Sequence, residues 1–284
     1  MPRLSRRGIL GGVVLLGGAG VAALRLKSRK RPQPPAVREV LFEGIVYERQ
    51  NRQAPRPMVL HWLSVDLSVP GVRFLATPGN PEAAMPFVGK KTTAFLKEQG
   101  CQIAINGDFF MPWYSSTIWD YYPKPGDPVA TQGAAASEGV IHNRNDGHLL
   151  KTTLWISREN EVQVSVEPPK SIWNAWGGHL LLLDGREENT ELSPRVAVGL
   201  VGTKLLLLVI DGRQSGYSEG ATAKELADIL VERGVSVTIQ LDGGGSATMV
   251  AQGRGILNSP IDCRIPGRER HVANHLGIFA KKLT

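Results

Sequence analysis

One acidic residue followed by three glycines and a serine is the part of this sequence best suited to chemistry. Asp242, Gly243, Gly244, Gly245 and Ser246 come directly after an apolar run. Consecutive glycines lose much conformational freedom on folding, so they favour a place where the backbone turns sharply or approaches a ligand closely. The pattern predicts a strand that ends at a site, with Asp242 as the main candidate for catalysis.

A second carboxylate follows another apolar run. Residues 204–210 predict a buried strand that ends before Asp211. A capping box at 222–225 opens a helix, and residues 235–241 form the next strand. Strand, helix and strand in this order predict a crossover between parallel strands, which brings Asp211 and Asp242 to one sheet edge and into one cleft.

Further polar groups stand next to predicted strands. Asn106 and Asp108 follow a short apolar strand, Arg195 precedes another, and Arg213 comes soon after Asp211. Carboxylates act as acids, bases or nucleophiles, and arginines bind paired anionic oxygens, so the set indicates a phosphate-bearing ligand such as a sugar phosphate. An Asp-Gly pair is also a common turn, and this simpler interpretation applies to Asp211 taken alone.

The same oxygen atoms allow a different interpretation, a divalent cation held by Asp211, Asp242 and Asn106. The sequence establishes no other cofactor. Cys101 and Cys263 are the only cysteines. In an oxidising compartment they either form a disulfide or remain free thiols, and their spacing does not favour a metal site.

The charge distribution excludes nucleic acid as a partner. Eight of the 33 Lys and Arg residues lie in residues 1–35, which carry no acid, so 25 basic residues face 26 acidic ones in the rest of the chain. The basic pI therefore belongs to the N-terminal segment and not to a binding face. No phosphate-binding loop is present, and Thr248 stands where a serine-hydrolase elbow around Ser246 requires glycine.

The N-terminal segment has the pattern of an export signal. An Arg pair precedes an uncharged apolar run over residues 8–24, and the motif around the pair resembles a twin-arginine signal, although a general secretory signal fits as well. The run also fits an uncleaved membrane anchor. We expect a signal or anchor with a stiff linker over 1–35, a globular domain over 36–284, and a periplasmic or extracellular location.

The coarse pattern favours an α+β (mixed α/β) fold, with one β-rich domain, a mixed sheet, a βαβ crossover near the C-terminus and few helices. Residues 59–69 alternate as in a strand with one wet face, and residues 92–99 predict a short helix. Seven of the 18 aromatic residues lie within 109–122. That segment is expected to be a loop that stacks on sugar rings or packs on its own side chains.

Six motifs occur in the order and spacing of the phosphodiester glycosidase family, which the chain resembles over about residues 58–281. The chain departs from the common motifs at Asp108, Val196 and Ala247 and keeps the polar site groups. The motifs cover residues 106–110, 194–199, 211–213, 220–226, 241–249 and 270–274.

The resemblance implies hydrolysis of sugar-1-phosphodiester bonds in an envelope or extracellular glycan. Asp242 would then act as nucleophile or base, or stabilise an oxocarbenium-like centre, with Asp211 or Asp108 as the second carboxylate. A phosphate ester is a good leaving group, so neutralising its charge matters more than strong acid assistance. The substrate-binding residues implied are Asn106, Arg195, Arg213, Gly243, Gly244, Gly245, Ser246, Arg270 and Asn274.

Two other functions remain open from the sequence. One is a non-catalytic protein of the envelope that binds a carbohydrate or polymer on the same fold, for which the aromatic segment 109–122 would serve equally well. The other is a hydrolase acting on peptidoglycan, which would need a second acid at the spacing that glycosidases use.

Overall fold

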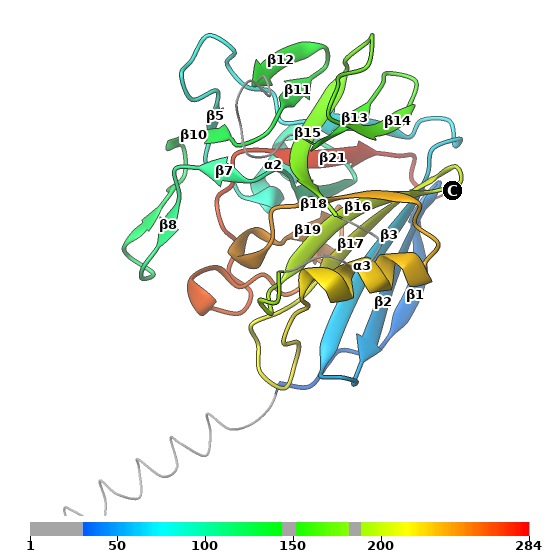
Figure 1. The fold of residues 1–284 in the computed structure, drawn as a ribbon, viewed down its shortest axis with the longest axis vertical. Coiled ribbons are helices and arrows are strands. Elements are labelled where there is room, and N and C mark those ends of the chain that lie inside the picture. Colours follow the sequence, from blue (N-terminus) through cyan, green and yellow to red (C-terminus); the bar gives the residue numbers. More distant parts are fainter. Residues whose placement is uncertain (1–30, 144–151, 182–188, 284) are drawn as a thin grey trace, which may run out of the picture.

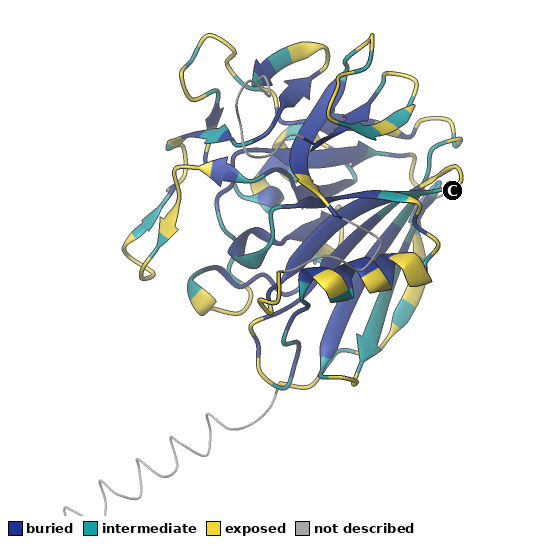
Figure 2. Ribbon diagram, in the orientation of Figure 1, coloured by how far each residue is buried: buried dark blue, intermediate teal, exposed yellow. Residues whose placement is uncertain are grey.

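A large antiparallel sheet forms the centre of the molecule in the computed structural model (Figure 1). The structure describes residues 31–143, 152–181 and 189–283. Eleven of the described strands belong to this sheet, and most of their residues are buried (Figure 2). They are β1 (Val37–Phe42), β2 (Ile45–Arg52), β3 (Met58–Asp66), β17 (Lys204–Ile210), β16 (Arg195–Val201), β18 (Val237–Leu241), β15 (Asn174–Leu180), β11 (Ala135–Ser137), β12 (Val140–Asn143), β13 (Thr152–Ile156) and β14 (Val162–Ser165).

A second sheet and two small ones complete the β structure. The second sheet consists of β20 (Gly255–Ile256), β19 (Met249–Ala251), β6 (Ile103–Asn106), β21 (His275–Phe279) and β4 (Arg73–Ala76). A three-stranded sheet consists of β5 (Phe87–Val88), β10 (Pro128–Thr131) and β7 (Phe110–Met111). A hairpin, β8 (Tyr114–Ser115) and β9 (Tyr121–Tyr122), projects from the body (Figure 1).

The large sheet is covered on both faces, which explains the continuous apolar run of β17. On one face Leu208 packs with Leu226 of α3 (Ala223–Glu232), the helix that lies across the sheet in Figure 1. On the other face Leu207 belongs to the main core, between the large sheet and the five-stranded sheet. The predicted capping box begins α3, because the Thr222 side chain and the Glu225 side chain each bond the other's backbone N–H.

The second helix, α2 (Thr92–Gln99), lies against the five-stranded sheet. Phe95 packs there with Leu75 and Ala104, and Gly100 ends the helix at φ 67°. The predicted helix over 92–99 is therefore confirmed. The layers follow in the order α3, large sheet, five-stranded sheet and α2, with the main core between the two sheets.

The expected mixed sheet is wrong. Strands β17 and β18 run in the same direction, but β16 lies between them and pairs antiparallel with both. Every pairing between named strands of the described chain is antiparallel. The prediction failed because a continuous apolar run reports that both faces of a strand are covered, and it carries no information about the direction of the neighbours.

The start of the described chain lies along the body, so the residues expected to form a spacer contribute contacts. Arg31 donates to Gln214 Oε1 at 2.9 Å and to Ser259 Oγ at 2.7 Å, and its guanidinium lies over the ring of Tyr217. Residues 1–30, which carry the predicted signal or anchor, lie outside the described residues. Among the residues described, no helix has the length and apolarity needed to cross a membrane.

Candidate active site

Polar strand ends from both sheets meet at one edge. The start of β16 lies between the ends of β17 and β18. Arg195 pairs with Ile210, next to Asp211, and Val196 pairs with Leu241, next to Asp242. From the five-stranded sheet, the Gly107 carbonyl accepts a hydrogen bond from the Asp242 N–H at 3.1 Å. The prediction that Asp211 and Asp242 follow strands ending at the same edge is therefore confirmed, because two strands antiparallel to one neighbour run the same way.

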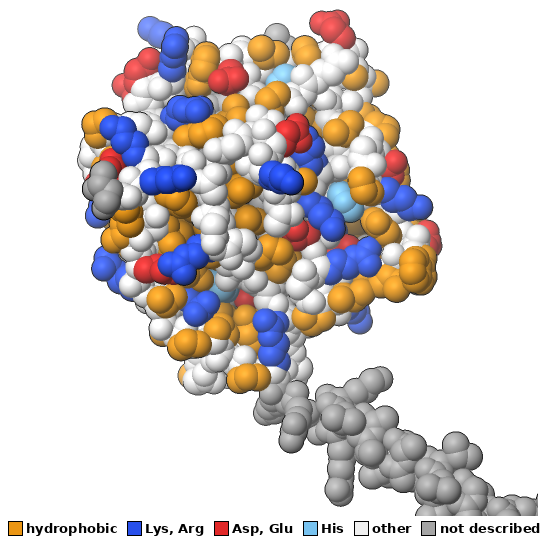
Figure 3. Space-filling view, turned by 180° about the vertical axis from the view of Figure 1, so that it is seen from behind, with side chains coloured by type: hydrophobic (Ala, Val, Ile, Leu, Met, Phe, Trp, Pro, Cys, Tyr) orange, Lys and Arg blue, Asp and Glu red, His pale blue; other side chains and the backbone are white. Residues whose placement is uncertain are grey.

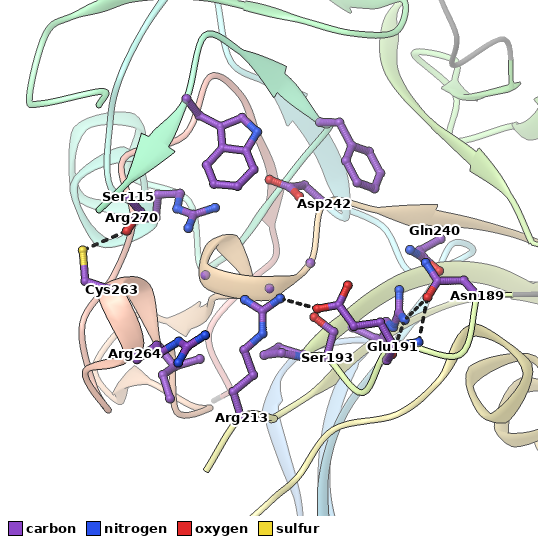
Figure 4. A pocket seen from close by; sticks show the side chains of 18 of the residues that line it. Ser115, Asn189, Glu191, Ser193, Arg213, Gln240, Asp242, Cys263, Arg264 and Arg270 are labelled. Atoms are coloured by element: carbon purple, nitrogen blue, oxygen red, sulfur yellow. Dashed lines mark hydrogen bonds and ion pairs between the residues drawn. The ribbon is translucent and has the colours of Figure 1, made fainter. Parts of the chain in front are cut away.

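A cleft of about 600 Å³ opens at this edge. Figure 4 shows Arg213, Arg264 and Arg270 on one side of Asp242, with Glu191 and Gln240 on the other. The lining residues come from loops far apart in the sequence. They are Phe109, Trp113, Ser115, Ser116, His179, Asn189, Glu191, Ser193, Pro194, Arg195, Arg213, Gln240, Asp242, Gly243, Gly244, Gly245, Ile261, Cys263, Arg264 and Arg270.

Asp242 is an acid of the cleft lining (Figure 4), and the residue is half-buried. Burial raises the pKa of its carboxyl group to about 6. The charge of Arg270, hydrogen bonds from Ser246 and Gly243, and the charge of Arg213 act in the opposite direction and lower this pKa. A carboxylate with a pKa just below neutral is mostly ionised at pH 7 and still basic enough to accept a proton during a reaction.

Two arginines bring positive charge to Asp242 and are themselves held in place. Arg270 Nε donates to Asp262 Oδ1 at 2.9 Å, and its guanidinium lies over the ring of Trp113, 4.7 Å from the centroid. Arg213 pairs with Glu191 at 2.9 Å, near the solvent. Each guanidinium has five N–H groups, so both retain donors for an anionic ligand.

The glycine run forms a 3₁₀ turn, η1 (Gly244–Ser246), under these arginines. Gly244 has φ 56°, a left-handed conformation that favours glycine, and a Cβ at Gly245 would lie 2.5 Å from a terminal nitrogen of Arg270. Gly243, Gly244 and Gly245 all line the cleft, whereas Ser246 is buried and accepts from Arg270 Nη1 at 3.4 Å. The absence of a side chain at Gly245 therefore leaves room for the Arg270 guanidinium, in addition to the expected approach of a ligand.

Two other arginines of the cleft differ in how far the protein holds them. Arg195 is buried, and its guanidinium donates to the carbonyls of Ala221 and Glu191 and to Asn189 Oδ1. These hydrogen bonds give Arg195 mainly a structural role in the lining of the cleft. Arg264, which the sequence prediction missed, is exposed and takes part in none of the hydrogen bonds or ion pairs of the described chain.

Asp211 does not line the cleft, so it does not face it with Asp242 as expected. Its side chain is buried, with Oδ2 at 3.0 Å from both His61 Nε2 and the Tyr217 hydroxyl. Its Oδ1 accepts from the Ser259 N–H at 2.8 Å and from Asn258 Nδ2 at 3.2 Å. Burial by itself would raise the pKa of Asp211, but His61 and the hydrogen bonds outweigh it and the pKa is lowered. Asp211 is an ionised link between three chain segments.

Asp108, Asn106 and Asn274 lie beneath the cleft and not in its lining. Asn106 Nδ2 donates to the Asp242 carbonyl at 2.6 Å, and the Asp108 N–H donates to Asn274 Oδ1 at 2.7 Å. Asp108 is buried, with Oδ2 accepting from the Gly133 N–H at 2.9 Å. Burial raises the pKa of Asp108 well above its usual value, and the charge of Asp242 adds to this. These residues support the loop that carries Asp242.

The oxygens proposed for a divalent cation do not converge. Both Asp211 oxygens accept hydrogen bonds, and Asn106 Oδ1 accepts one from the Thr248 N–H at 3.0 Å. Within the described ranges, no group of three or more His, Cys, Asp or Glu residues has the geometry to hold a metal ion. The residues present therefore do not fit the proposed cation.

Both cysteines are free thiols. Cys101 is buried against α2, where burial raises its pKa to about 11, whereas Cys263 lines the cleft. The alternative of a Cys101–Cys263 disulfide is therefore wrong, since the two residues belong to different parts of the fold.

A family model described as phosphodiester glycosidase matches residues 99–279 of this chain. The chain belongs to the phosphodiester glycosidase family. The matched region contains β6, η1 and the loop around Arg270, so it includes both the floor and the arginine side of the cleft.

Individual relatives agree with that membership. The chain is 28% identical over 241 residues to bovine N-acetylglucosamine-1-phosphodiester α-N-acetylglucosaminidase, covering 72% of the chain and 44% of the bovine protein. It thus spans under half the length of that relative. The zebrafish enzyme of the same name, solved as a catalytic domain auto-inhibited by its pro-peptide, aligns with TM-score 0.59 and 22% identity over 89% of this chain and 86% of that one. A hypothetical protein from Synechocystis aligns with TM-score 0.63 and 14% identity over 87% of this chain and 64% of that one, and likewise shows the fold.

Several residues in the cleft were not predicted from the sequence. Gln240 lies on β18, two residues before Asp242, which directly follows this strand, so the alternation of a strand could have indicated it. His179 pairs with Gln240 across β15 and β18, and its ring meets Phe109 at 4.8 Å between centroids. Arg264 had no such signal, because it lies in a loop that only the tertiary fold brings to the cleft.

Replacing Asp211 by Asn tests its structural role. The amide keeps one acceptor oxygen, but its N–H₂ group faces hydrogen-bond donors, and the buried negative charge opposite His61 is lost. We therefore expect the free energy of unfolding to fall by about 3 kcal/mol. Urea unfolding at pH 7 measures this. The matched control Asp228→Asn breaks only an exposed pair with Lys224 on α3 and should change it by less than about 0.5 kcal/mol. An Asp211→Asn protein as stable as the parent would contradict this role.

Asp242 should have the opposite effect on stability. The pKa of Asp242 is about 6 in the folded state, above the usual value of 3.8. The unfolded chain therefore loses this proton at a lower pH than the folded protein does. As the pH rises from 4 to 6, the free energy of unfolding falls because of this group. Asp242→Asn should therefore match the parent near pH 4 and unfold at a higher temperature above pH 6. Thermal unfolding at both pH values checks this, and a variant less stable than the parent at pH 7 would refute it.

Proposed function

We propose that this protein hydrolyses the bond between the anomeric carbon of a sugar and a phosphodiester. The observation that carries the proposal is the position of Asp242, which lies in the cleft beside two arginines that are themselves anchored, Arg213 and Arg270. A carboxylate suits the anomeric carbon, and guanidinium groups suit the phosphate. Family membership supports this pairing of groups.

The reaction breaks the bond from the anomeric carbon to oxygen, and water supplies the new hydroxyl of the sugar. The phosphate leaves with the second alcohol as a monoester, which carries one more negative charge than the diester. Arg213 and Arg270 neutralise that developing charge, and Arg264 stands on the same side of the cleft (Figure 4). Charge stabilisation of this kind often contributes more to a rate than any other single effect.

Asp242 acts on the anomeric carbon, either directly as nucleophile or through a water molecule as base. Glu191 is the other acid in the described lining, and it is paired with Arg213. The phosphate leaving group needs little help from an acid, so one free carboxylate suffices. Proton NMR of the first product separates the two roles, because attack by Asp242 retains the anomeric configuration and activation of water inverts it.

The side of the cleft away from Arg264 and Arg270 fits the sugar. Gln240 and Asn189 offer amide groups there, and Phe109 with His179 supplies a ring surface. Rings and amides together are typical of sugar-binding sites. The names of the bovine and zebrafish relatives point to N-acetylglucosamine as the sugar to test first.

We place this activity outside the cytoplasm, on phosphodiester-linked sugars of an envelope or extracellular glycan. The proposal rests on the export-like pattern at the N-terminus, where residues 8–24 are apolar and follow an Arg pair. The same run would anchor the protein to the membrane if it remains uncleaved.

Substitution of Asp242 tests the proposed reaction. Incubation of the protein with N-acetylglucosamine-1-phosphodiesters should release free sugar, and Asp242→Asn should lower kcat at least about 1000-fold because the reaction loses its carboxylate. Asp228→Asn on α3 is the matched control and should keep full activity. Sugar binding by calorimetry without any product, unchanged in Asp242→Asn, would instead establish the non-catalytic binding function.

The pH profile provides an independent test. Asp242 must be ionised to act, so kcat/KM should rise with pH and level off above its pKa of about 6. Because the charge of Arg270 lowers this pKa, Arg270→Gln should move the midpoint to higher pH as well as reduce the plateau. A rate that is flat between pH 4.5 and 7.5 would contradict the role given to Asp242.

A further inference from the structure

The hairpin that borders the cleft exposes an unusual number of large apolar side chains. Trp119 is 81% exposed, and five other exposed apolar side chains lie near it in the sequence or in the adjoining η2 (Asp262–Arg264) loop. We call this set the apolar edge. Its members are Met111, Trp113, Tyr114, Ile118, Trp119 and Ile265.

One of the two expectations for residues 109–122, a loop packed on its own side chains, holds only in part, because Tyr114 stacks on Tyr122 while Trp119 stays exposed. Figure 1 shows the β8–β9 hairpin projecting from the body, and Figure 2 shows it exposed or half-buried. A soluble surface seldom gathers so much apolar area in one place without a partner. Apart from Met85 and Val88, which are three residues apart, the other large exposed hydrophobic residues of the described surface stand singly along the chain.

The composition of the apolar edge distinguishes between partners. Trp and Tyr have an apolar body and a polar group, which suits them to the boundary between lipid headgroups and acyl chains. Ile118 and Ile265 gain nothing from stacking on sugar rings, but they gain free energy on transfer to hydrocarbon. A projecting hairpin can enter such a layer, whereas a protein partner would have to form a pocket around it.

Positive charge lies beside the apolar edge. Arg264 is exposed, and Arg268 lies over the ring of Tyr121, 4.7 Å from its centroid, while it pairs with Asp262 at 3.3 Å. Asp120 is the one acid within residues 111–122. Seen from behind, the molecule shows basic side chains next to hydrophobic ones along this border (Figure 3). Arginines at the rim of an apolar surface attract anionic headgroups.

We infer that the apolar edge docks on an anionic lipid surface, with the hairpin tip at the level of the headgroups and Arg264 and Arg268 on their phosphates. Trp113, Ser115 and Arg264 also line the cleft, so docking would bring the cleft to phosphodiesters that lie at the membrane. The inference concerns the surface only, and it does not depend on the proposed hydrolysis.

Fluorescence quenching by brominated lipids tests the docking in the full chain. The protein is mixed with vesicles of phosphatidylglycerol and phosphatidylcholine whose acyl chains carry bromine, and the emission of Trp119 is obtained as the difference between the parent and Trp119→Phe. We expect the bromine atoms to quench this emission at least about twofold. The reading reports the position of the hairpin, and a variant of the hairpin in the same full chain separates docking from attachment through the N-terminal segment.

A charge placed in the apolar edge provides the matched comparison. Ile118→Asp should abolish the quenching of Trp119, while Val231→Asp, which alters an equally exposed apolar residue on α3, should leave it unchanged. Ile118→Asp should retain hydrolysis of a water-soluble phosphodiester, so loss of docking and loss of activity are distinguishable. Trp119 emission that is unquenched by brominated lipid, or that becomes shielded from acrylamide with rising protein concentration in the absence of vesicles, would overturn the inference.

Discussion

The buried carboxylate of Asp211 is the interaction on which the geometry of the cleft depends. It directly follows β17, and its two oxygens connect the end of that strand to His61 of β3, to Tyr217 and to the backbone at Ser259. Arg213 lies two residues beyond this link, and the loop that carries Arg270 continues from Ser259. Because a buried charge without partners is very unfavourable, these segments have little freedom to separate. The hydrogen bonds of Asp211 therefore hold in place the side of the cleft that carries Arg213 and Arg270.

Asp242, an acid in the cleft, has a pKa shifted in the opposite direction from that of Asp211. Burial disfavours the ionised form of Asp242, and the positive charges of Arg270 and Arg213 offset only part of this effect. Asp211 thus has a lowered pKa and a structural role, whereas Asp242 has a raised pKa and stands in the cleft. The two acids follow strands of the same sheet, and the difference between them comes from whether donors surround the carboxylate or leave it facing the cleft. This contrast is what makes Asp242 available for chemistry.

Local patterns of the sequence predicted much of the fold. The capping box at Thr222 and the apolar runs around β17 and β18 placed three elements correctly, since each depends on residues close together in the chain. The direction of neighbouring strands was predicted wrongly, because β16 enters between β17 and β18 and its pairing depends on residues distant in the sequence. The common edge was nevertheless predicted, because it requires only that the two strands run the same way.

The same division applies to the site. The sequence by itself predicted that Asp242 and the glycine run form a loop at a site, because three glycines directly after a strand favour a sharp turn or the close approach of a ligand. Only the tertiary structure decided that Asp211 is buried, that Asn106 and Asp108 form the floor, and that Arg264 and Gln240 reach the cleft. Burial, hydrogen-bond partners and pKa depend on which segments meet in space. A sequence motif records the residue that is present, and the fold determines which donors and charges surround it.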